Sequence, residues 1–295
     1  MKHRYLYTQL LFLVTLMFTG CVKRELEFPT DTSLRIAFDW SRLADKQDIP
    51  SVMQLIFYDE NGAYLFSRHS SSDFYQEKLP SGTYRILIYN PDATGVAFNN
   101  ITQFDEARIS TLSQQGGKDD DNQLEAPHNV YGASIGNLTI HPYQPADTTI
   151  IPRLYVHNII LRLKITGNTQ ELASCSASIG GVSGSLNLST GIPASGDNAS
   201  VTGNLYPRDN LYKGLFYVIG NDEQHKSMLS VHLRFSDGSE RTLLENVTDS
   251  MEQLKELEKE VPLIIEATID VKLVDGVFVA TLEEWTYKTG EVTVS

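Results

Sequence analysis

The amino-acid sequence predicts an all-β protein made of two tandem Greek-key β-sandwich domains with one or two short helices. Apolar and polar residues alternate through many short segments, which is the pattern of half-buried strands. Turn dipeptides that favour positive φ, namely Asn61-Gly62, Asp237-Gly238 and Asp275-Gly276, separate these segments as hairpin turns do. Of the 295 residues, 275 remain after a predicted export signal is removed, and that length suits two ordinary domains.

Residues 1–20 have the order of a secretory signal peptide. Lys2 and Arg4 form a positive start, a short apolar run follows, and the small pair Thr19-Gly20 stands directly before Cys21. The apolar run is shorter than the roughly 20 residues that a membrane-spanning helix needs. We therefore expect cleavage after Gly20. An ordinary signal peptide with an incidental cysteine is the alternative.

Phe18-Thr19-Gly20-Cys21 resembles a bacterial lipobox, in which the cysteine becomes the acylated first residue of the mature chain. This resemblance implies lipid attachment at Cys21 through diacylglyceryl and N-acyl groups such as palmitate. Two or more acyl chains anchor a protein stably. Residues 21–32 then form a short polar tether, whose charged residues loosely resemble the export signal of Bacteroidetes surface lipoproteins. The expected location is the outer membrane, facing the cell exterior.

The net charge and the number of cysteines argue against nucleic-acid partners, electrostatic binding to lipid and disulfide bonds. The formal net charge is −13, and loss of Lys2 and Arg4 with the signal leaves −15. Such acidity argues against nucleic acid and against electrostatic binding to anionic lipid. The chain has two cysteines, so acylation of Cys21 leaves Cys175 without a disulfide partner. We expect Cys175 to be a small buried residue.

The first domain is expected over residues 33–150. Its predicted strands cover residues 34–40, 52–58, 63–66, 74–79 and 83–90, with a return to the sheet at 130–133. Residues 104–113 have helical spacing and predict a short surface helix. Residues 114–123 have the composition of a mobile loop, and residues 141–152 are expected to connect the two domains.

The motif Leu79-Pro80-Ser81-Gly82-Thr83-Tyr84 resembles a turn found in transthyretin-like β-sandwich domains of exported Bacteroidetes proteins. Proline fixes φ and glycine permits positive φ in such a turn. The resemblance implies a sandwich hairpin and carries no information about ligands.

The second domain is expected over residues 151–295. Its predicted strands cover residues 154–166, 172–179, 185–188, 214–219, 229–235, 241–244, 263–274 and 277–282. A helix is predicted over 249–261, with Asp249 as its N-cap and Pro262 as its end.

Several motifs in order resemble the fimbrillin and fimbrial-anchor lipoproteins of Bacteroidales. They are the lipobox, the Leu79–Tyr84 turn, residues 157–165, residues 181–188 and residues 279–294 around Trp285. The resemblance implies a non-enzymatic accessory or anchor subunit of an adhesive fimbria that joins pilin subunits by strand addition. Alternatives are a chain that accepts a strand, a surface lipoprotein unconnected with fimbriae, and a glycan-binding lipoprotein.

The residues with catalytic or metal-binding chemistry do not form a recognisable site, so we expect no catalytic residue, metal or cofactor. His157 shares its strand face with apolar residues and is expected in the core. The run 119–122 lacks the ligand spacing of a calcium loop. Ser183 lacks the glycine and the strand–turn–helix context of a nucleophile elbow. The aromatic residues Trp40, Tyr143 and Trp285 could stack on sugars, although core packing is the more common role.

Overall fold

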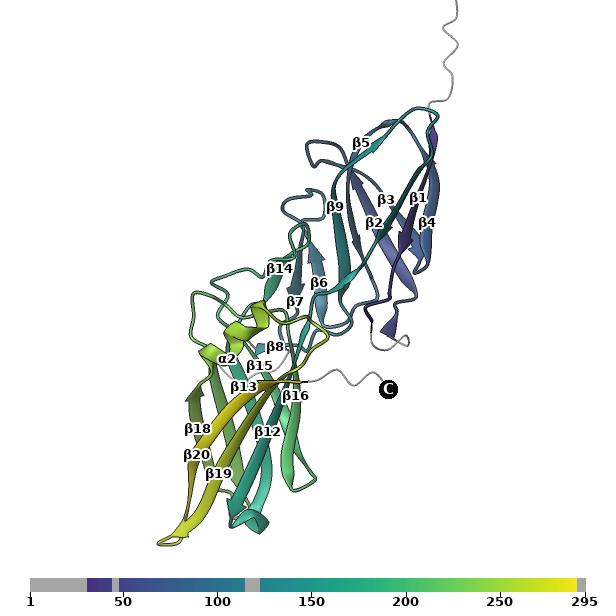
Figure 1. Cartoon of the computed structure of the whole chain (residues 1–295). Helices are drawn as coiled ribbons and strands as arrows, with labels where there is room; N and C mark the ends of the chain where they lie inside the picture. Colours follow the sequence, from purple (N-terminus) through teal and green to yellow (C-terminus); the bar gives the residue numbers. More distant parts are fainter. Residues whose placement is uncertain (1–30, 44–47, 115–122, 291–295) are drawn as a thin grey trace, which may run out of the picture.

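The computed structural model describes residues 31–43, 48–114 and 123–290, and nearly all regular structure in them is strand (Figure 1). This confirms the all-β fold class. The strands up to residue 154 are β1 (Thr32–Phe38), β2 (Val52–Tyr58), β3 (Tyr64–Ser71), β4 (Phe74–Leu79), β5 (Gly82–Tyr89), β6 (Val96–Asn99), β7 (Arg108–Thr111), β8 (Gln123–Leu124), β9 (Tyr131–Ile140), β10 (Ala146–Ile150) and β11 (Arg153–Leu154).

The rest of the chain adds longer strands and a few helical turns. The strands are β12 (His157–Gly167), β13 (Leu172–Val182), β14 (Ser185–Asn187), β15 (Ala199–Arg208), β16 (Leu211–Val218), β17 (Met228–Phe235), β18 (Glu240–Asn246), β19 (Leu263–Val274) and β20 (Val277–Thr289). The helical segments are the 3₁₀ turn η2 (Thr169–Glu171), the helix α2 (Thr248–Glu252) and the 3₁₀ turn η3 (Gln253–Lys255).

The first half of the chain forms a sandwich of two sheets. Sheet β10-β1-β4 faces sheet β11-β9-β5-β2-β3, and their inner side chains form a common core. In β1 the alternate residues Leu34, Ile36 and Phe38 are buried, as their period of two predicts. β1 also pairs in parallel with β10, from Leu34 opposite Ala146 to Phe38 opposite Ile150. Residues 141–152 therefore contain a strand of this sandwich in addition to a connection.

Two turn motifs have the structure that the sequence predicts. Between β2 and β3, Gly62 has φ of +84°, and the Asp59 carboxylate accepts hydrogen bonds from the N–H groups of Asn61 and Ala63. Between β4 and β5, the buried Tyr84 ring folds back so that its hydroxyl donates to the Pro80 carbonyl oxygen at 2.9 Å. The tyrosine of the motif thus closes the turn that precedes it.

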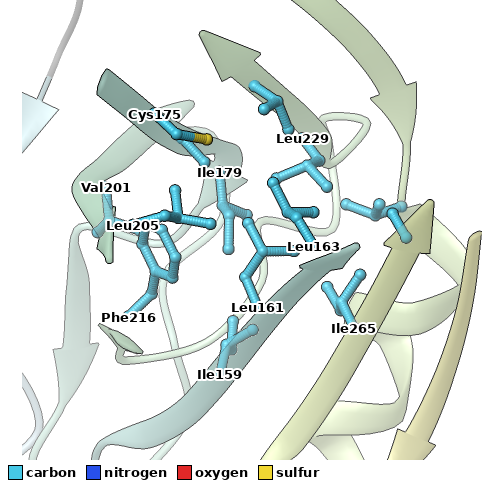
Figure 2. Close-up of a cluster of buried hydrophobic side chains, with 14 of the residues drawn as sticks. Ile159, Leu161, Leu163, Cys175, Ile179, Val201, Leu205, Phe216, Leu229 and Ile265 are labelled. Atoms are coloured by element: carbon cyan, nitrogen blue, oxygen red, sulfur yellow. The ribbon is translucent and has the colours of Figure 1, made fainter. Parts of the chain in front are cut away.

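The second half forms one strongly curved sheet that encloses its own core. The strand order is β18-β17-β13-β15-β16-β12-β19-β20, and β8 pairs with β15 at one side. β15 pairs with β13 through its first part and with β16 through its last three residues, so the sheet turns over at this strand. Figure 2 shows the enclosed cluster, in which Leu161 and Leu163 of β12 lie close to Ile179 and Leu229.

A third core joins the two halves. The outer faces of β2 and β5 carry Ile56, Tyr58, Leu87 and Tyr89, and all four are buried. They are covered by residues of both halves: Phe104, Ala107, Ile109, Val130, Tyr155, Val156, Leu186, Leu188 and Ile219. β2 and β5, in the middle of the five-stranded sheet, are therefore buried on both faces, as continuous apolar strands require.

The predicted helix over residues 104–113 is wrong. Residues 108–111 form β7, which pairs with β6 on one side and with β14 from the second half on the other. Ile109 is fully buried in the third core, whereas Leu112 is 41% exposed. The backbone pairing supplied by β14 is a long-range contact, so local spacing could not indicate it.

The predicted helix over residues 249–261 is shorter than expected. It is helical only from Thr248 to Lys255, across α2 and η3. Asp249 is not its N-cap, because Val247 occupies that position without a side-chain cap. Met251 and Leu254 of this segment enter the core.

The proposed division into 33–150 and 151–295 remains a prediction. Strand pairing crosses residue 150 at β7 with β14 and at β8 with β15. β10, β15 and the short strands β6 and β8 were not predicted as strands. The predicted mobile loop lies mostly outside the described residues, as do the 119–122 run and Cys21.

Candidate functional site

The chain enters the first sandwich at the end that lies away from the second half. Thr32, the first residue of β1, pairs with Leu79, and its hydroxyl donates to the His141 carbonyl oxygen at 3.1 Å. At the other end of β1, Phe38 pairs with Ile150, close to the junction of the two halves. The predicted attachment residue Cys21 lies outside the described residues. A tether joined to β1 would begin at the end of the molecule opposite the β19–β20 hairpin (Figure 1).

The curved sheet of the second half ends in two edge strands that lie next to each other but are not paired by backbone hydrogen bonds. These edges are β18 and β20 among the described strands. Arg241 of β18 bridges them, since its Nε donates to the Phe278 carbonyl oxygen of β20 at 2.6 Å. Beyond this contact, Met251 and Leu254 fill the core below α2 and η3.

β20 presents the longer of these two edges. It has 13 residues, and its pairing with β19 leaves its other side without a strand partner in the part of the chain that the structure describes. On its inner face Phe278 is buried, whereas Ala280, Leu282 and Trp285 are only partly covered. The Phe278 carbonyl oxygen points away from β19, because it accepts from Arg241 across the gap. On this part of β20, residues whose side chains point into the core therefore direct their N–H and C=O groups toward the free edge, away from β19.

A second candidate is a cleft at the junction of the two halves. It consists of two adjoining hollows of about 260 and 350 Å³. We call the two hollows together the junction cleft. Both are lined by Arg42, Ile151, Arg153, Tyr155, Thr190 and Gly191. The larger hollow extends toward β9 and β10, and the smaller one toward residues 257–260.

One wall of the junction cleft is a turn that hydrogen bonds hold in place. The Asn187 side-chain oxygen accepts from the hydroxyl and N–H groups of both Ser189 and Thr190. Gly191 has φ of +72°, and its N–H donates to the Asn187 carbonyl oxygen at 2.8 Å. Ser134 of β9 donates its hydroxyl to the Ser189 carbonyl oxygen at 2.7 Å. The turn of the second half is thereby fixed to a strand of the first.

None of the described residues considered for chemistry lines the β20 edge or the junction cleft, although His157 contacts Lys259 of the smaller hollow. His157 is buried, as predicted, against Lys259. Cys175 is buried, and burial raises the pKa of its thiol to about 12. The Ser183 hydroxyl, also buried, donates to the carbonyl oxygens of Ser185 and Ala194, so it is a structural group.

The three aromatic residues do not form one sugar-stacking surface. Trp40 packs edge-on against Tyr131 at 5.5 Å between ring centroids and donates its Nε1–H to the Ser72 carbonyl oxygen at 2.7 Å. Trp285 is partly covered by the second core. Tyr143 is 67% exposed in the connection between β9 and β10.

A buried carboxylate that sequence reasoning missed fixes two loops of the second half. Asp222 accepts hydrogen bonds from the N–H groups of Gly196, Asn198 and Gln224 and contacts His225 Nδ1, all within 3.0 Å. Burial by itself would raise the pKa of Asp222, but these donors outweigh it and hold the pKa well below its usual range. In the sequence, the only local sign of such a site is the presence of Gly196 and Asn198, residue types that tolerate the positive φ they adopt here.

Two further features of the described residues bear on function. No group of three or more His, Cys, Asp or Glu side chains in them is placed to hold a metal ion. None of the helices in the described ranges is long and apolar enough to cross a membrane.

The fold is similar to that of solved structures from Bacteroidales. A candidate adhesin from Bacteroides ovatus ATCC 8483 matches with a TM-score of 0.66 and 17% identity, over 87% of this chain and 94% of that one. The fimbrial anchor protein Mfa2 from Porphyromonas gingivalis matches with a TM-score of 0.57 and 10% identity, over 87% and 97%. A candidate polysaccharide-binding protein from Bacteroides thetaiotaomicron VPI-5482 matches with a TM-score of 0.51 and 14% identity, over 90% and 100%.

Sequence comparison places the chain in a family. No curated protein matches it. A family model described as "Domain of unknown function (DUF5119)" matches residues 20–202, which is more than half of the chain. The matched range begins at the end of the predicted signal, spans the first sandwich and most of the third core, and ends in β15. The chain is therefore a member of the DUF5119 family.

Proposed function

We propose that this protein is a non-enzymatic outer-membrane lipoprotein that faces the cell exterior and serves as an accessory or anchor subunit of an adhesive fimbria. Acyl chains on Cys21 attach it to the membrane, and a pilin subunit binds it by adding a strand to its sheet. The similarity in fold to a fimbrial anchor protein supports this role.

The observation that carries the proposal is the free edge of β20. A donated strand needs a row of unpaired backbone groups and pockets for alternate side chains. β20 has both, because its outward backbone groups face a gap and its inner residues Ala280, Leu282 and Trp285 are only partly covered. A strand bound there would cover this apolar strip and continue the sheet.

The path of the chain from the tether at β1 to the β20 edge is compatible with such a role. The tether joins β1 at one end of the molecule, and the second half lies beyond the far end of the first sandwich (Figure 1). A molecule attached through Cys21 would carry β20 away from the membrane. The edge would then face subunits that assemble outside the cell.

Deletion of the gene tests the proposed role directly. We expect electron micrographs of the deletion strain to show fimbriae that are absent, detached or abnormal in length, and the wild-type gene to restore them. A Cys21→Ala gene is expected to give protein that fails to incorporate a palmitate analogue and leaves the membrane fraction. Unchanged fimbriae in a strain that normally expresses the protein would refute the fimbrial role.

A proline substitution tests the edge itself. Ala280→Pro removes an N–H group that points outward and leaves the ladder with β19 intact, whereas Ala280→Ser keeps that N–H group and serves as the matched control. We expect fimbrial subunits to be recovered with the wild-type and Ala280→Ser proteins from solubilised membranes and to be lost with Ala280→Pro. Equal recovery with both variants would exclude the β20 edge as the binding site.

A further inference from the structure

The junction cleft has two arginines, Arg42 and Arg153, that form no close ion pair with the described residues. Arg42 follows β1, and Arg153 begins β11. Neither guanidinium has a carboxylate oxygen within 4 Å among the described residues, although the chain as a whole carries a net charge of −13. The carboxylate of Asp39, which is near Arg42, accepts a hydrogen bond from the Ser41 N–H instead. Other described cations also lack an ion pair, but Arg42 and Arg153 are distinguished by lining the same cleft.

The two hollows of the cleft differ in charge. The larger one, of about 350 Å³, contains no acidic residue in its lining, so Arg42 and Arg153 are its only charged groups. Its other polar side chains are the hydroxyl residues Ser134, Thr149 and Thr190. The smaller hollow adds Glu258, Glu260 and Lys259. An anionic group is therefore favoured in the larger hollow and is repelled by the two carboxylates at the far side of the smaller one.

Tyr155, which lines both hollows, is tightly packed. The Tyr155 ring is buried between two glycines, and a Cβ atom would lie 2.4 Å from the ring at Gly132 and 3.5 Å from it at Gly191. Any side chain at Gly132 would displace the ring. The turn through Thr190 and Gly191 is held by Asn187, so the opposite wall is rigid as well. A site that needs no rearrangement loses little entropy when a ligand binds.

We propose that the junction cleft binds an acidic saccharide whose carboxylate groups pair with Arg42 and Arg153. A guanidinium donates two parallel hydrogen bonds to a carboxylate, which gives both affinity and orientation. The Ser134 and Thr190 hydroxyls already donate within the protein, so they can accept hydrogen bonds from sugar hydroxyls. A hollow of this volume lies in the usual range for small-ligand sites. An acidic peptide fits less well, because β11 offers an edge of only two residues for strand addition.

Titration calorimetry on the full-length lipoprotein in detergent tests the inference. The probes are trigalacturonate, its fully methyl-esterified form, hexaglutamate and inorganic phosphate. We expect trigalacturonate to bind, its uncharged ester not to bind, and hexaglutamate and phosphate to compete only at much higher concentrations. Each of Arg42→Gln and Arg153→Gln should weaken trigalacturonate binding by about tenfold or more, since a charge-assisted hydrogen bond contributes that much.

Arg208→Gln is the matched control, because Arg208 is exposed on β15, remote from the cleft lining. It should bind trigalacturonate as the wild type does. Thermal melting of each variant shows whether it has folded, and protection of Arg153 from phenylglyoxal by trigalacturonate in the wild-type protein gives a readout that needs no variant.

Four results would overturn the proposal: no binding of trigalacturonate, equal binding of the ester, unchanged binding by the Arg42→Gln and Arg153→Gln double variant, or tighter binding of hexaglutamate. The last result would assign the cleft to an acidic peptide. The outcome is independent of the fimbrial role, because the cleft and the β20 edge share no residue.

Discussion

Lys259 reaches into the junction of the two halves and places its ammonium nitrogen against Nε2 of His157. The same nitrogen donates to the Ile219 carbonyl oxygen at 3.1 Å. Burial lowers the pKa of Lys259 to about 8, and burial together with the Lys259 charge lowers the pKa of His157 to about 2. His157 is thus a neutral acceptor, and the segment before β19 is tied to the start of β12.

This contact predicts that stability rises with alkaline pH. Between pH 8 and 10 the unfolded chain keeps the Lys259 proton while the folded chain loses it, so the unfolded state binds more protons and unfolding becomes less favourable. The unfolding free energy of the wild type relative to Lys259→Met should rise by on the order of 2 kcal/mol over this range. Urea titrations at several pH values measure it.

Lys255→Met is the control for that measurement. The hydrogen bond from Lys255 to Glu223 raises the pKa of Lys255, so the folded state holds this proton at least as strongly as the unfolded chain. The difference between the wild type and Lys255→Met should therefore not rise between pH 8 and 10. A constant difference for Lys259→Met as well would show that Lys259 is not buried as described.

Asp222→Asn should destabilise the second half. The substitution removes a charged acceptor from the N–H groups of Gly196, Asn198 and Gln224, and we expect a loss of about 3 kcal/mol at pH 7. Because the folded pKa is depressed, this stabilisation is fully present above the unfolded pKa and is lost as pH falls below about 4. The exposed neighbour substitution Glu223→Gln should change stability little; a loss as large as that of Asp222→Asn would argue against a specific role for the buried carboxylate.

Leu186→Ala tests the third core. Leu186 is fully buried beneath the five-stranded sheet, although it belongs to β14 of the second half. Truncation should cost about 3 kcal/mol through lost burial and the cavity that remains. Leu244→Ala, at a position that is 65% exposed on β18, should cost less than about 0.5 kcal/mol. Chemical denaturation compares the two, and equal costs would mean that the halves do not share a core.

Alanine substitutions at two glycines with similar φ distinguish the cost of backbone strain from the cost of a steric clash. Gly167 has φ of +79° and Gly238 has φ of +84°, but a Cβ atom would lie 2.1 Å from the Val271 carbonyl oxygen at Gly167 and would meet nothing within 4 Å at Gly238. Gly238→Ala should cost about 1 kcal/mol for the left-handed conformation alone. Gly167→Ala should cost several times more in thermal or urea unfolding. If the two costs were the same, the close approach of β12 to β19 at Gly167 would be ruled out.

Thiol titration tests both cysteines together. The buried Cys175, with its raised pKa, should not react with Ellman's reagent in the native protein at pH 8 and should react fully in guanidinium chloride. If Cys21 carries a lipid thioether, denatured protein from membranes has one reactive thiol per chain. Two reactive thiols would contradict lipidation, and the Cys21→Ala protein gives the reference value of one.

The sequence alone predicted the strands whose apolar pattern and flanking turns are set by residues close together in the chain. Alternating residues in β1 and β12 identified the buried faces, and Gly62 and Gly276 marked hairpin turns that the structure contains. It also predicted that His157 and Cys175 are core residues. Each of these inferences rests on neighbours within a few positions along the chain, where periodicity and turn propensity act.

Tertiary structure decided what depends on distant partners. Residues 108–111 form a strand between β6 and β14; β14 comes over 70 residues later, and Leu186 of β14 helps to cover the outer face of β5. The junction cleft exists only because Arg42 and Arg153 of the first half meet the Thr190 turn of the second. The free edge of β20 likewise depends on the order of strands in the sheet, since a strand's own residues do not determine whether a neighbour covers it.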